Sequence, residues 1–139
     1  MNTNDDNRRW QTFQGSPNRN KHDGRPRVTL DSRGRVRMNE KAYEIFGSPE
    51  AVELHFDPET ATIALSRRDP HADNAFQVYT PVDWKKRRYR QINIAPFCNF
   101  WDLSPERTML FTNVRVTSTG KLLLDITTAV PIGKPSVKA

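Results

Sequence analysis

Seven consecutive residues, 84–90, combine dense positive charge with aromatic rings. The basic residues are Lys85, Lys86, Arg87, Arg88 and Arg90, and the aromatic residues are Trp84 and Tyr89. Basic side chains neutralise phosphates and an aromatic ring can stack on a base, so the combination is typical of nucleic-acid contact. The alternative is a solvated hairpin arm whose two aromatic residues pack back onto a sheet.

A second basic segment has alternating arginines, at Arg33, Arg35 and Arg37. Alternate residues of a strand share one face, so the three guanidinium groups project together while Val36 and Met38 face the other way. Positive groups in a row repel one another unless an anion lies against them. The segment therefore either contacts phosphate or is a solvated edge strand protected by charge.

Other kinds of chemistry find little support in the sequence. His22, His55 and His71 are far apart and have no cysteine partner at metal-ligand spacing, so we expect no metal site. No Gly-rich phosphate loop or nucleophile motif is present, and we expect neither an enzyme nor a cofactor. Cys98 lies in an apolar run and is expected to be a small buried residue, not a catalytic thiol.

The composition agrees with a polyanionic partner. The 139 residues include 22 Lys plus Arg against 16 Asp plus Glu, which gives a net charge of +6. With 35% hydrophobic residues, we expect one small domain between a flexible polar tail at 1–27 and an irregular tail at 127–139. A single cysteine, no apolar leader and no membrane-length run favour the cytoplasm.

The elements that must position these residues begin in a first half at residues 28–65. Period-two alternation on both sides of a turn at 31–34 predicts a hairpin. Asn39 can cap a short helix that Gly47 ends, and its apolar face is Ala42, Ile45 and Phe46. Alternating apolar residues between 52 and 65, interrupted by a DPET turn, predict a second hairpin.

Residues 76–126 repeat this order in degraded form, after a polar linker at 66–75. Strands are predicted around residues 76–78 and 92–94, and a helix near Pro96 has the same apolar spacing at Phe97, Phe100 and Trp101. Residues 109–116 and 122–126 are expected to form the closing hairpin. The chain is therefore predicted to be mainly β with two short helices, as two fused ββαββ halves in a pseudo-twofold barrel that brings both basic hairpins onto one face.

The first half resembles the swapped-hairpin family of bacterial DNA-binding domains typified by AbrB, MazE and MraZ, over about forty residues. The matching positions are Asp31, Gly34, Arg35, Val36, Phe46, Gly47, Leu54 and Ile63. The resemblance implies that two copies interleave their hairpins into one barrel-like unit and that this unit binds DNA. The MraZ branch is similar to this chain in carrying both copies in one polypeptide.

The first hypothesis is a cytoplasmic DNA-binding transcriptional regulator that uses both basic hairpins, with DNA favoured over RNA. A protein-interaction or scaffold module on the same fold is the alternative, and it is favoured by Tyr43 and Glu44 on the first helix, where AbrB-like helices place basic residues. An antitoxin-like partner ranks lower, because the C-terminal tail lacks a long acidic, aromatic segment. A protein partner or a homo-oligomer is compatible with each hypothesis.

Overall fold

The structure is a computed structural model that describes residue 11, residues 25–81 and residues 89–132. Within these residues it contains two helices, α1 (Glu40–Phe46) and α2 (Ala95–Trp101), and a 3-10 turn, η2 (Ile126–Thr128). The strands are β1 (Val28–Leu30), β2 (Arg35–Asn39), β3 (Ala51–Asp57), β4 (Thr62–Arg67), β5 (Phe76–Tyr79), β6 (Tyr89–Asn93), β7 (Thr108–Phe111), β8 (Val114–Val116), β9 (Leu122–Asp125) and β10 (Val130–Ile132). The prediction of a mainly β chain with two short helices is confirmed.

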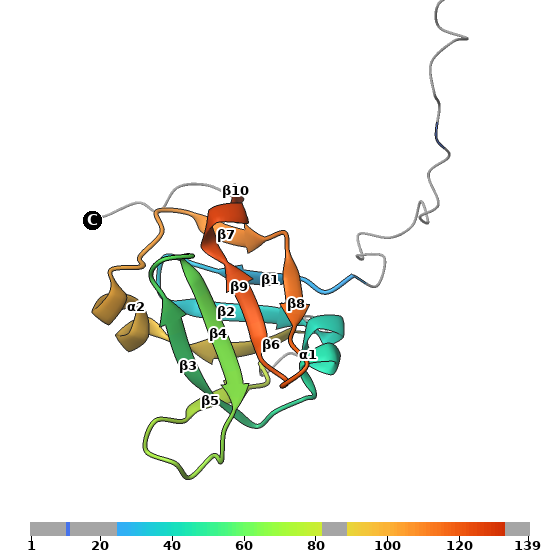
Figure 1. The fold of residues 1–139 in the computed structure, drawn as a ribbon, viewed down its shortest axis with the longest axis vertical. Helices are drawn as coiled ribbons and strands as arrows, with labels where there is room; N and C mark the ends of the chain where they lie inside the picture. Colours follow the sequence, from blue (N-terminus) through green and yellow to red (C-terminus); the bar gives the residue numbers. More distant parts are fainter. Residues whose placement is uncertain (1–10, 12–24, 82–88, 133–139) are drawn as a thin grey trace, which may run out of the picture.

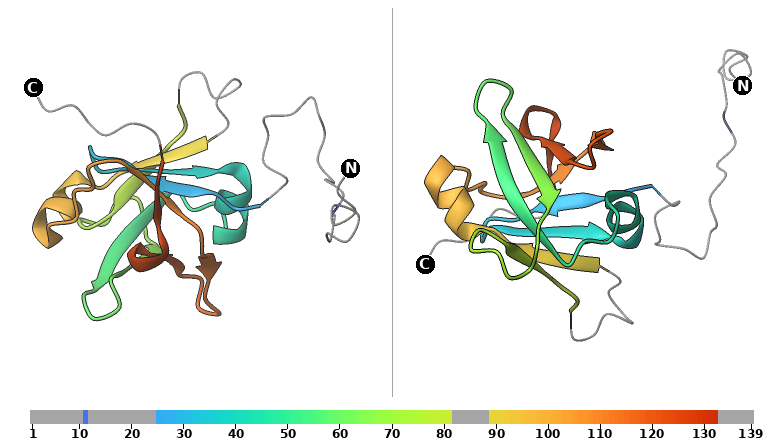
Figure 2. Two further views of the ribbon diagram at one scale, coloured as in Figure 1. Left: turned by 90° about the horizontal axis from the view of Figure 1, so that it is seen from above. Right: turned by 60° about the horizontal axis from the view of Figure 1, so that its bottom comes forward.

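The described strands form one antiparallel sheet in the order β10-β7-β1-β2-β6-β5-β3-β4-β9-β8. The sheet curls, so that β3, β4 and β9 cross over β1, β2 and β6, and α1 and α2 lie at opposite ends (Figures 1 and 2). Apolar side chains from both sides of this crossing are fully buried between the layers. They include Val36, Met38, Ile92 and Ile94 from one side, and Ile63, Leu65, Leu122 and Leu124 from the other.

The elements of the first half lie where the sequence pattern predicts them. β1 and β2 form an antiparallel hairpin, as do β3 and β4. Asn39 caps α1, because its side-chain oxygen accepts a hydrogen bond from the backbone N–H of Ala42 at 2.9 Å. Gly47 ends the helix with a φ of 96°, a left-handed conformation that glycine adopts without strain.

The apolar faces of the two helices are narrower than predicted. Ala42 and Phe46 of α1 are buried, but Ile45 between them is 37% exposed. In α2, Phe97 is buried and Phe100 is 78% exposed. A helix of seven residues makes only two turns and buries a narrow stripe, which is Ala42 and Phe46 in α1 and the adjacent Phe97 and Cys98 in α2. Trp101, four residues after Phe97, is itself 37% exposed.

The predicted strand at residues 109–116 is two strands with different partners. β7 ends at Phe111 and pairs with β1 and β10, whereas β8 begins at Val114 and pairs with β9. The closing hairpin is therefore β8–β9 alone. Thr112 and Asn113 lie at the break, and the different partners of the two pieces distinguish the two strands.

Parts of both predicted tails are attached to the sheet. The Asn39 side chain accepts a hydrogen bond from the N–H of Arg27 at 3.0 Å and donates one to the carbonyl of Arg25 at 2.8 Å. At the other end, β10 pairs with β7, where Pro131 is tolerated because β10 is an edge strand. The irregular tail predicted at 127–139 therefore contains η2 and a strand, and its residues 133–139 lie outside the described part.

The segment that links the two halves is shorter than the ten residues predicted, because β4 continues to Arg67. Its loop is held by side chains: Arg68 Nε donates to Asn74 Oδ1 at 3.0 Å, and Asn74 Nδ2 donates to Glu53 Oε2 of β3 at 3.1 Å. These bonds lie at the surface and fix the path between the two halves.

Candidate nucleic-acid interface

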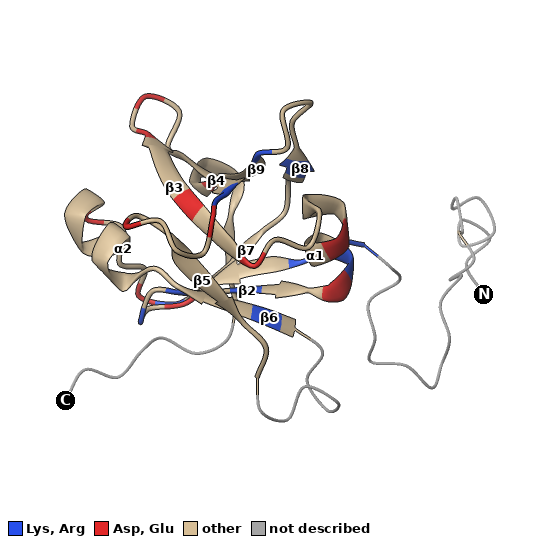
Figure 3. Ribbon diagram, turned by 90° about the horizontal axis from the view of Figure 1, so that it is seen from below, with Lys and Arg blue, Asp and Glu red and all other residues tan. Residues whose placement is uncertain are grey.

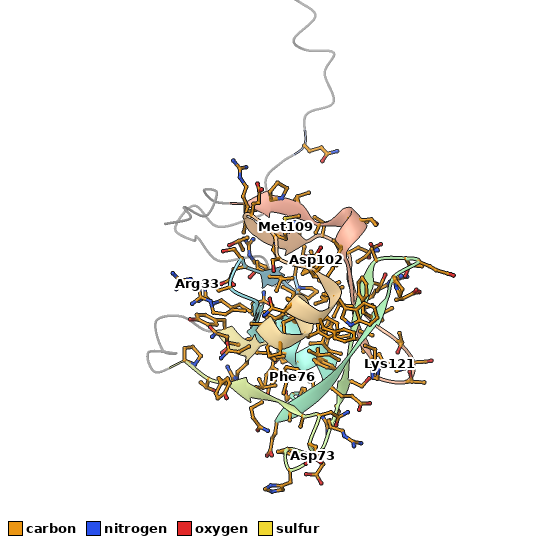
Figure 4. The ribbon with its side chains drawn as sticks, turned by 90° about the vertical axis from the view of Figure 1, so that its left-hand side faces the viewer. Arg33, Asp73, Phe76, Asp102, Met109 and Lys121 are labelled. Atoms are coloured by element: carbon orange, nitrogen blue, oxygen red, sulfur yellow. The ribbon has the colours of Figure 1, made fainter. Side chains whose placement is uncertain are left out.

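The β1–β2 turn is built around the carboxylate of Asp31, which is only 8% exposed. One carboxylate oxygen accepts hydrogen bonds from the backbone N–H groups of Arg33 and Arg35, both at 3.0 Å. The other accepts from Nε of Arg35 at 2.6 Å. The Asp31 carboxylate therefore holds the turn together by hydrogen bonds. The exposed side chain of Arg33 projects from the turn at the edge of the molecule (Figure 4).

The same turn is fixed against the beginning of α2. Gly34 has a φ of 78°, and its carbonyl accepts a hydrogen bond from the N–H of Ile94 at 2.7 Å. A Cβ on Gly34 would lie 2.6 Å from Cα of Ala95, well inside van der Waals contact. Glycine is required here by both the conformation and the close approach, and the arginine turn therefore has a defined position.

Arg37 lies at the centre of a polar network on the outer side of the β2–β6 ladder. Its Nε donates to Oε1 of Gln91 at 3.1 Å, and its guanidinium carbon lies 5.3 Å from the centre of the Tyr89 ring. Nε2 of Gln91 in turn donates to Oδ1 of Asn93 at 2.9 Å. The network restrains the guanidinium group, which reduces the side-chain entropy lost when it contacts an anion.

Tyr79 completes this surface, and the sequence interpretation missed it. The register places Arg37 opposite Gln91 and Gln91 opposite Tyr79, so the three residues share one face of three neighbouring strands. Tyr79 is 51% exposed. Alternation in β5, with Phe76 and Val78 packed against the core, could have assigned Tyr79 to the outer side but could not have named its neighbours.

We use the name outer face for this side of β1, β2, β5 and β6. Its members in the register are Thr29, Arg35, Arg37, Tyr79, Tyr89, Gln91 and Asn93. These four strands contain arginine but no aspartate or glutamate, whereas β3 and β9 carry acidic residues. In Figure 3, β2 and β6 accordingly carry blue segments without red. The outer face is therefore positive and polar, with aromatic rings.

The predicted alignment of the two basic hairpins on one face can be followed only at Tyr89 and Arg90, because residues 82–88 lie outside the described part of the chain. β2 and β6 are antiparallel, so the Arg33 turn lies at the Asn93 end of the ladder, and Tyr89 lies at the other end, opposite Asn39. Arg90 pairs with Met38 and its guanidinium carbon lies 4.8 Å from the ring centre of Tyr43 in α1. Strand alternation thus sends Arg90 away from the outer face, while Tyr89 joins it.

The remaining residues of the basic segment lie outside the described part of the chain. They are Trp84, Lys85, Lys86, Arg87 and Arg88. Of the ten residues proposed from the sequence, the structure brings together Arg35, Arg37 and Tyr89, with Arg33 at the adjoining turn.

Cys98 is buried, at 2% exposure, as the sequence predicts. Burial, together with the negative charge of Asp31, raises the pKa of its thiol to about 11. The thiol is thus protonated near neutral pH and is a poor nucleophile. The described residues include no group of three or more His, Cys, Asp or Glu arranged to hold a metal ion. None of the helices described is long and apolar enough to cross a membrane.

An apolar groove lies on a different side, between β7 and the segment that follows α2. Its volume is about 500 Å³, and Leu103, Met109 and Phe111 line it, with Asp102 and Arg107 among its polar members. Figure 4 shows Asp102 and Met109 toward this part of the molecule, beyond α2. Leu30, the last residue of β1, also lines the groove.

Comparisons of this chain with protein-family models, with curated proteins and with solved structures gave no match.

Proposed function

We propose that this chain is a non-enzymatic nucleic-acid-binding protein and, following the AbrB-like resemblance, a DNA-binding transcriptional regulator. The observation that carries this function is the outer face, where Arg37 lies on a central ladder whose strands contain no acidic residue, beside Arg35, whose charge is paired with Asp31 of the turn. Arg33 extends the positive surface at the turn. Guanidinium groups held at fixed positions suit phosphate oxygens, which accept two parallel hydrogen bonds.

We also propose that the fold is a pair of fused swapped-hairpin halves related by a pseudo-twofold axis. Three pairings support this arrangement. The second strand of each half, β2 and β6, pair with each other at the centre, while β3 pairs with β5 and β7 pairs with β1. Each half thus contributes a strand to the first hairpin of the other half. Beyond these strands the halves differ. In the first half β3 pairs with the next strand, β4, whereas in the second half β7 pairs with β10 and not with the next strand, β8.

The test is a fluorescence-anisotropy titration with labelled DNA, duplex and single-stranded, at low and at physiological salt. We expect affinity to fall linearly with salt on a logarithmic scale. The double variant Arg33→Gln/Arg37→Gln should lower that salt slope by about two, one for each phosphate that is no longer neutralised. A variant of residues 85–88 with all four charges removed tests the segment outside the described residues in the same way.

The matched control is Arg115→Gln/Lys121→Gln, which removes the same charge from exposed positions on β8 and in the β8–β9 turn. In Figure 3, β8 and β9 lie away from β2 and β6. An equal effect of both double variants would mean that net charge alone attracts DNA. Absent or salt-insensitive binding of both DNA forms would reject the proposed function.

A protein-interaction module is the second candidate, and a separate surface favours it. Phe100 is 78% exposed and lies 5.1 Å, centre to centre, from the ring of Trp101, which itself packs on Phe56 at 5.0 Å. Exposed aromatic residues beside apolar surface are enriched at protein interfaces. A stoichiometric partner that no longer binds the Phe100→Ala variant, in a protein that binds no nucleic acid, would favour this function.

A further inference from the structure

The width of the outer face bears on the form of nucleic acid that it can take. β2 and β6 lie at the centre of the sheet, with β1 and β5 as their outer neighbours. Strands lie about 4.8 Å apart, so four of them span roughly 14 Å between the outer axes before side chains are added. The major groove of B-DNA is about 12 Å wide and admits a two-stranded ribbon. This four-stranded face is therefore too broad to enter the groove.

The two aromatic residues on this face present their rings to different extents. Tyr79 is 51% exposed, and its side chain makes no hydrogen bond or ring contact with any other described residue. Tyr89 is half-buried and has Arg37 against its ring. The two tyrosines are diagonal neighbours across β5 and β6, a relation that separates residues by about 7–8 Å. In a duplex each base is covered by its neighbours, whereas an unpaired base can leave the stack and lie on an aromatic ring.

Polar groups beside the rings can contact the rest of a nucleotide. Gln91 lies directly between Arg37 and Tyr79 in the register, and the exposed Asn93 follows it on the same face. Because Asn93 uses its oxygen to accept from Gln91, its NH₂ group remains as a donor for a base edge. Arg37 is bound through Nε, which leaves its terminal nitrogens for a phosphate.

We infer that the outer face is a stacking platform for single-stranded nucleic acid, with Tyr79 and Tyr89 under successive bases and Arg37 on the backbone. This inference rests on the proposed function and specifies the form of its ligand. Stacking on an aromatic ring accepts every base, so the platform has little sequence preference of its own. The charge of Arg37 makes its affinity salt-dependent.

The experiment compares a fluorescein-labelled oligothymidine with a mixed-sequence duplex of the same length, using the full chain. The oligothymidine is expected to bind more tightly than the duplex. Tyr79→Ala should weaken oligothymidine binding roughly 5- to 150-fold, which is the loss of one stacked base. Tyr79→Phe keeps the ring and should bind as the unaltered protein does.

Two further variants keep the result interpretable. Tyr79→Thr removes the ring but retains a residue that favours strands, so it separates stacking from any loss of β5. Phe100→Ala removes a ring that is even more exposed from α2 and should leave oligothymidine binding unchanged. An equal loss of affinity with Phe100→Ala would overturn the assignment to the outer face.

The inference and the proposed function fail in different ways. Preference for the duplex, with Tyr79→Ala binding like the unaltered protein, overturns the platform and leaves a nucleic-acid-binding protein. Binding of neither probe overturns both. Circular dichroism of each variant shows whether its sheet is intact.

Discussion

Replacing Gly34 by alanine tests the attachment of the arginine turn to α2. Two terms contribute to the expected loss of stability. A residue with a Cβ at a φ of 78° costs about 1–2 kcal/mol relative to glycine. The new Cβ would also lie 2.6 Å from Cα and 2.8 Å from N of Ala95, so the turn and the helix must separate. Overpacking of this kind costs about 1–3 kcal/mol.

Gly120→Ala is the matched control for the backbone term. Gly120 has a φ of 86°, close to that of Gly34, but a Cβ there would meet no atom within 4 Å. We therefore expect Gly120→Ala to cost about 1–2 kcal/mol and Gly34→Ala about 2–5 kcal/mol. Because small domains have only about 5–15 kcal/mol of total stability, the second loss is large.

The measurement is urea unfolding at equilibrium, followed by circular dichroism, with the free energy of unfolding extrapolated to water for each variant. The difference between the two variants, about 1–3 kcal/mol, isolates the contact with Ala95. Equal losses of stability in the two variants would refute the close approach of the turn to α2, and with it the fixed position of Arg33.

Two other perturbations have expected outcomes. Asn39→Ala removes the cap of α1 and the acceptor of Arg27 N–H, and should lower the free energy of unfolding in urea by about 1–3 kcal/mol. Asn39→Asp keeps the acceptor oxygen and should lower it less. Equal losses in the two variants would contradict the capping role. The raised pKa of Cys98 keeps its thiol protonated in the folded state up to about pH 11, whereas the thiol of the unfolded chain ionises near 9.0. The contribution of this thiol to the free energy of unfolding should therefore be fully present below pH 9 and fall by up to about 2–3 kcal/mol between pH 9 and 11. Unfolding of Cys98→Ala over the same pH range is the comparison, and a wild-type advantage that does not shrink with pH would argue against burial of the thiol.

The predictions from sequence succeeded where local signals act within a few residues. The hairpin at Gly34, the cap at Asn39 and the end of α1 at Gly47 each depend on one residue whose preference is strong enough to act alone. Burial of Cys98 followed from its apolar neighbours. In each case the chemistry that determines the structure lies next to the residue in the chain.

The predictions failed where a distant strand decides the outcome. The break between β7 and β8 exists because β7 pairs with β1, about eighty residues earlier, while β8 pairs with β9. The antiparallel direction of β2 and β6 separates the Arg33 turn from Tyr89, and the register of β5 places Tyr79 in the site. Periodicity assigns a residue to a face of its own strand, but the neighbouring strands and their directions are tertiary information.

The pairing of β1 with β7 has a consequence for the order in which the chain can fold as it is synthesised. When residues 28–67 have left the ribosome, β1, β2, β3 and β4 can form their two hairpins, but β7, β6, β5 and β9 have not yet been made. Until then, β1, β2, β3 and β4 each have one unpaired edge, and such edges can pair with another chain. Long-range pairing of this kind slows folding, and the last edge of β1 is closed only when residues 108–111 arrive. The nascent chain is thus most prone to aggregate midway through its synthesis. With this topology, the first half must be kept from pairing with other chains until the second half has been made.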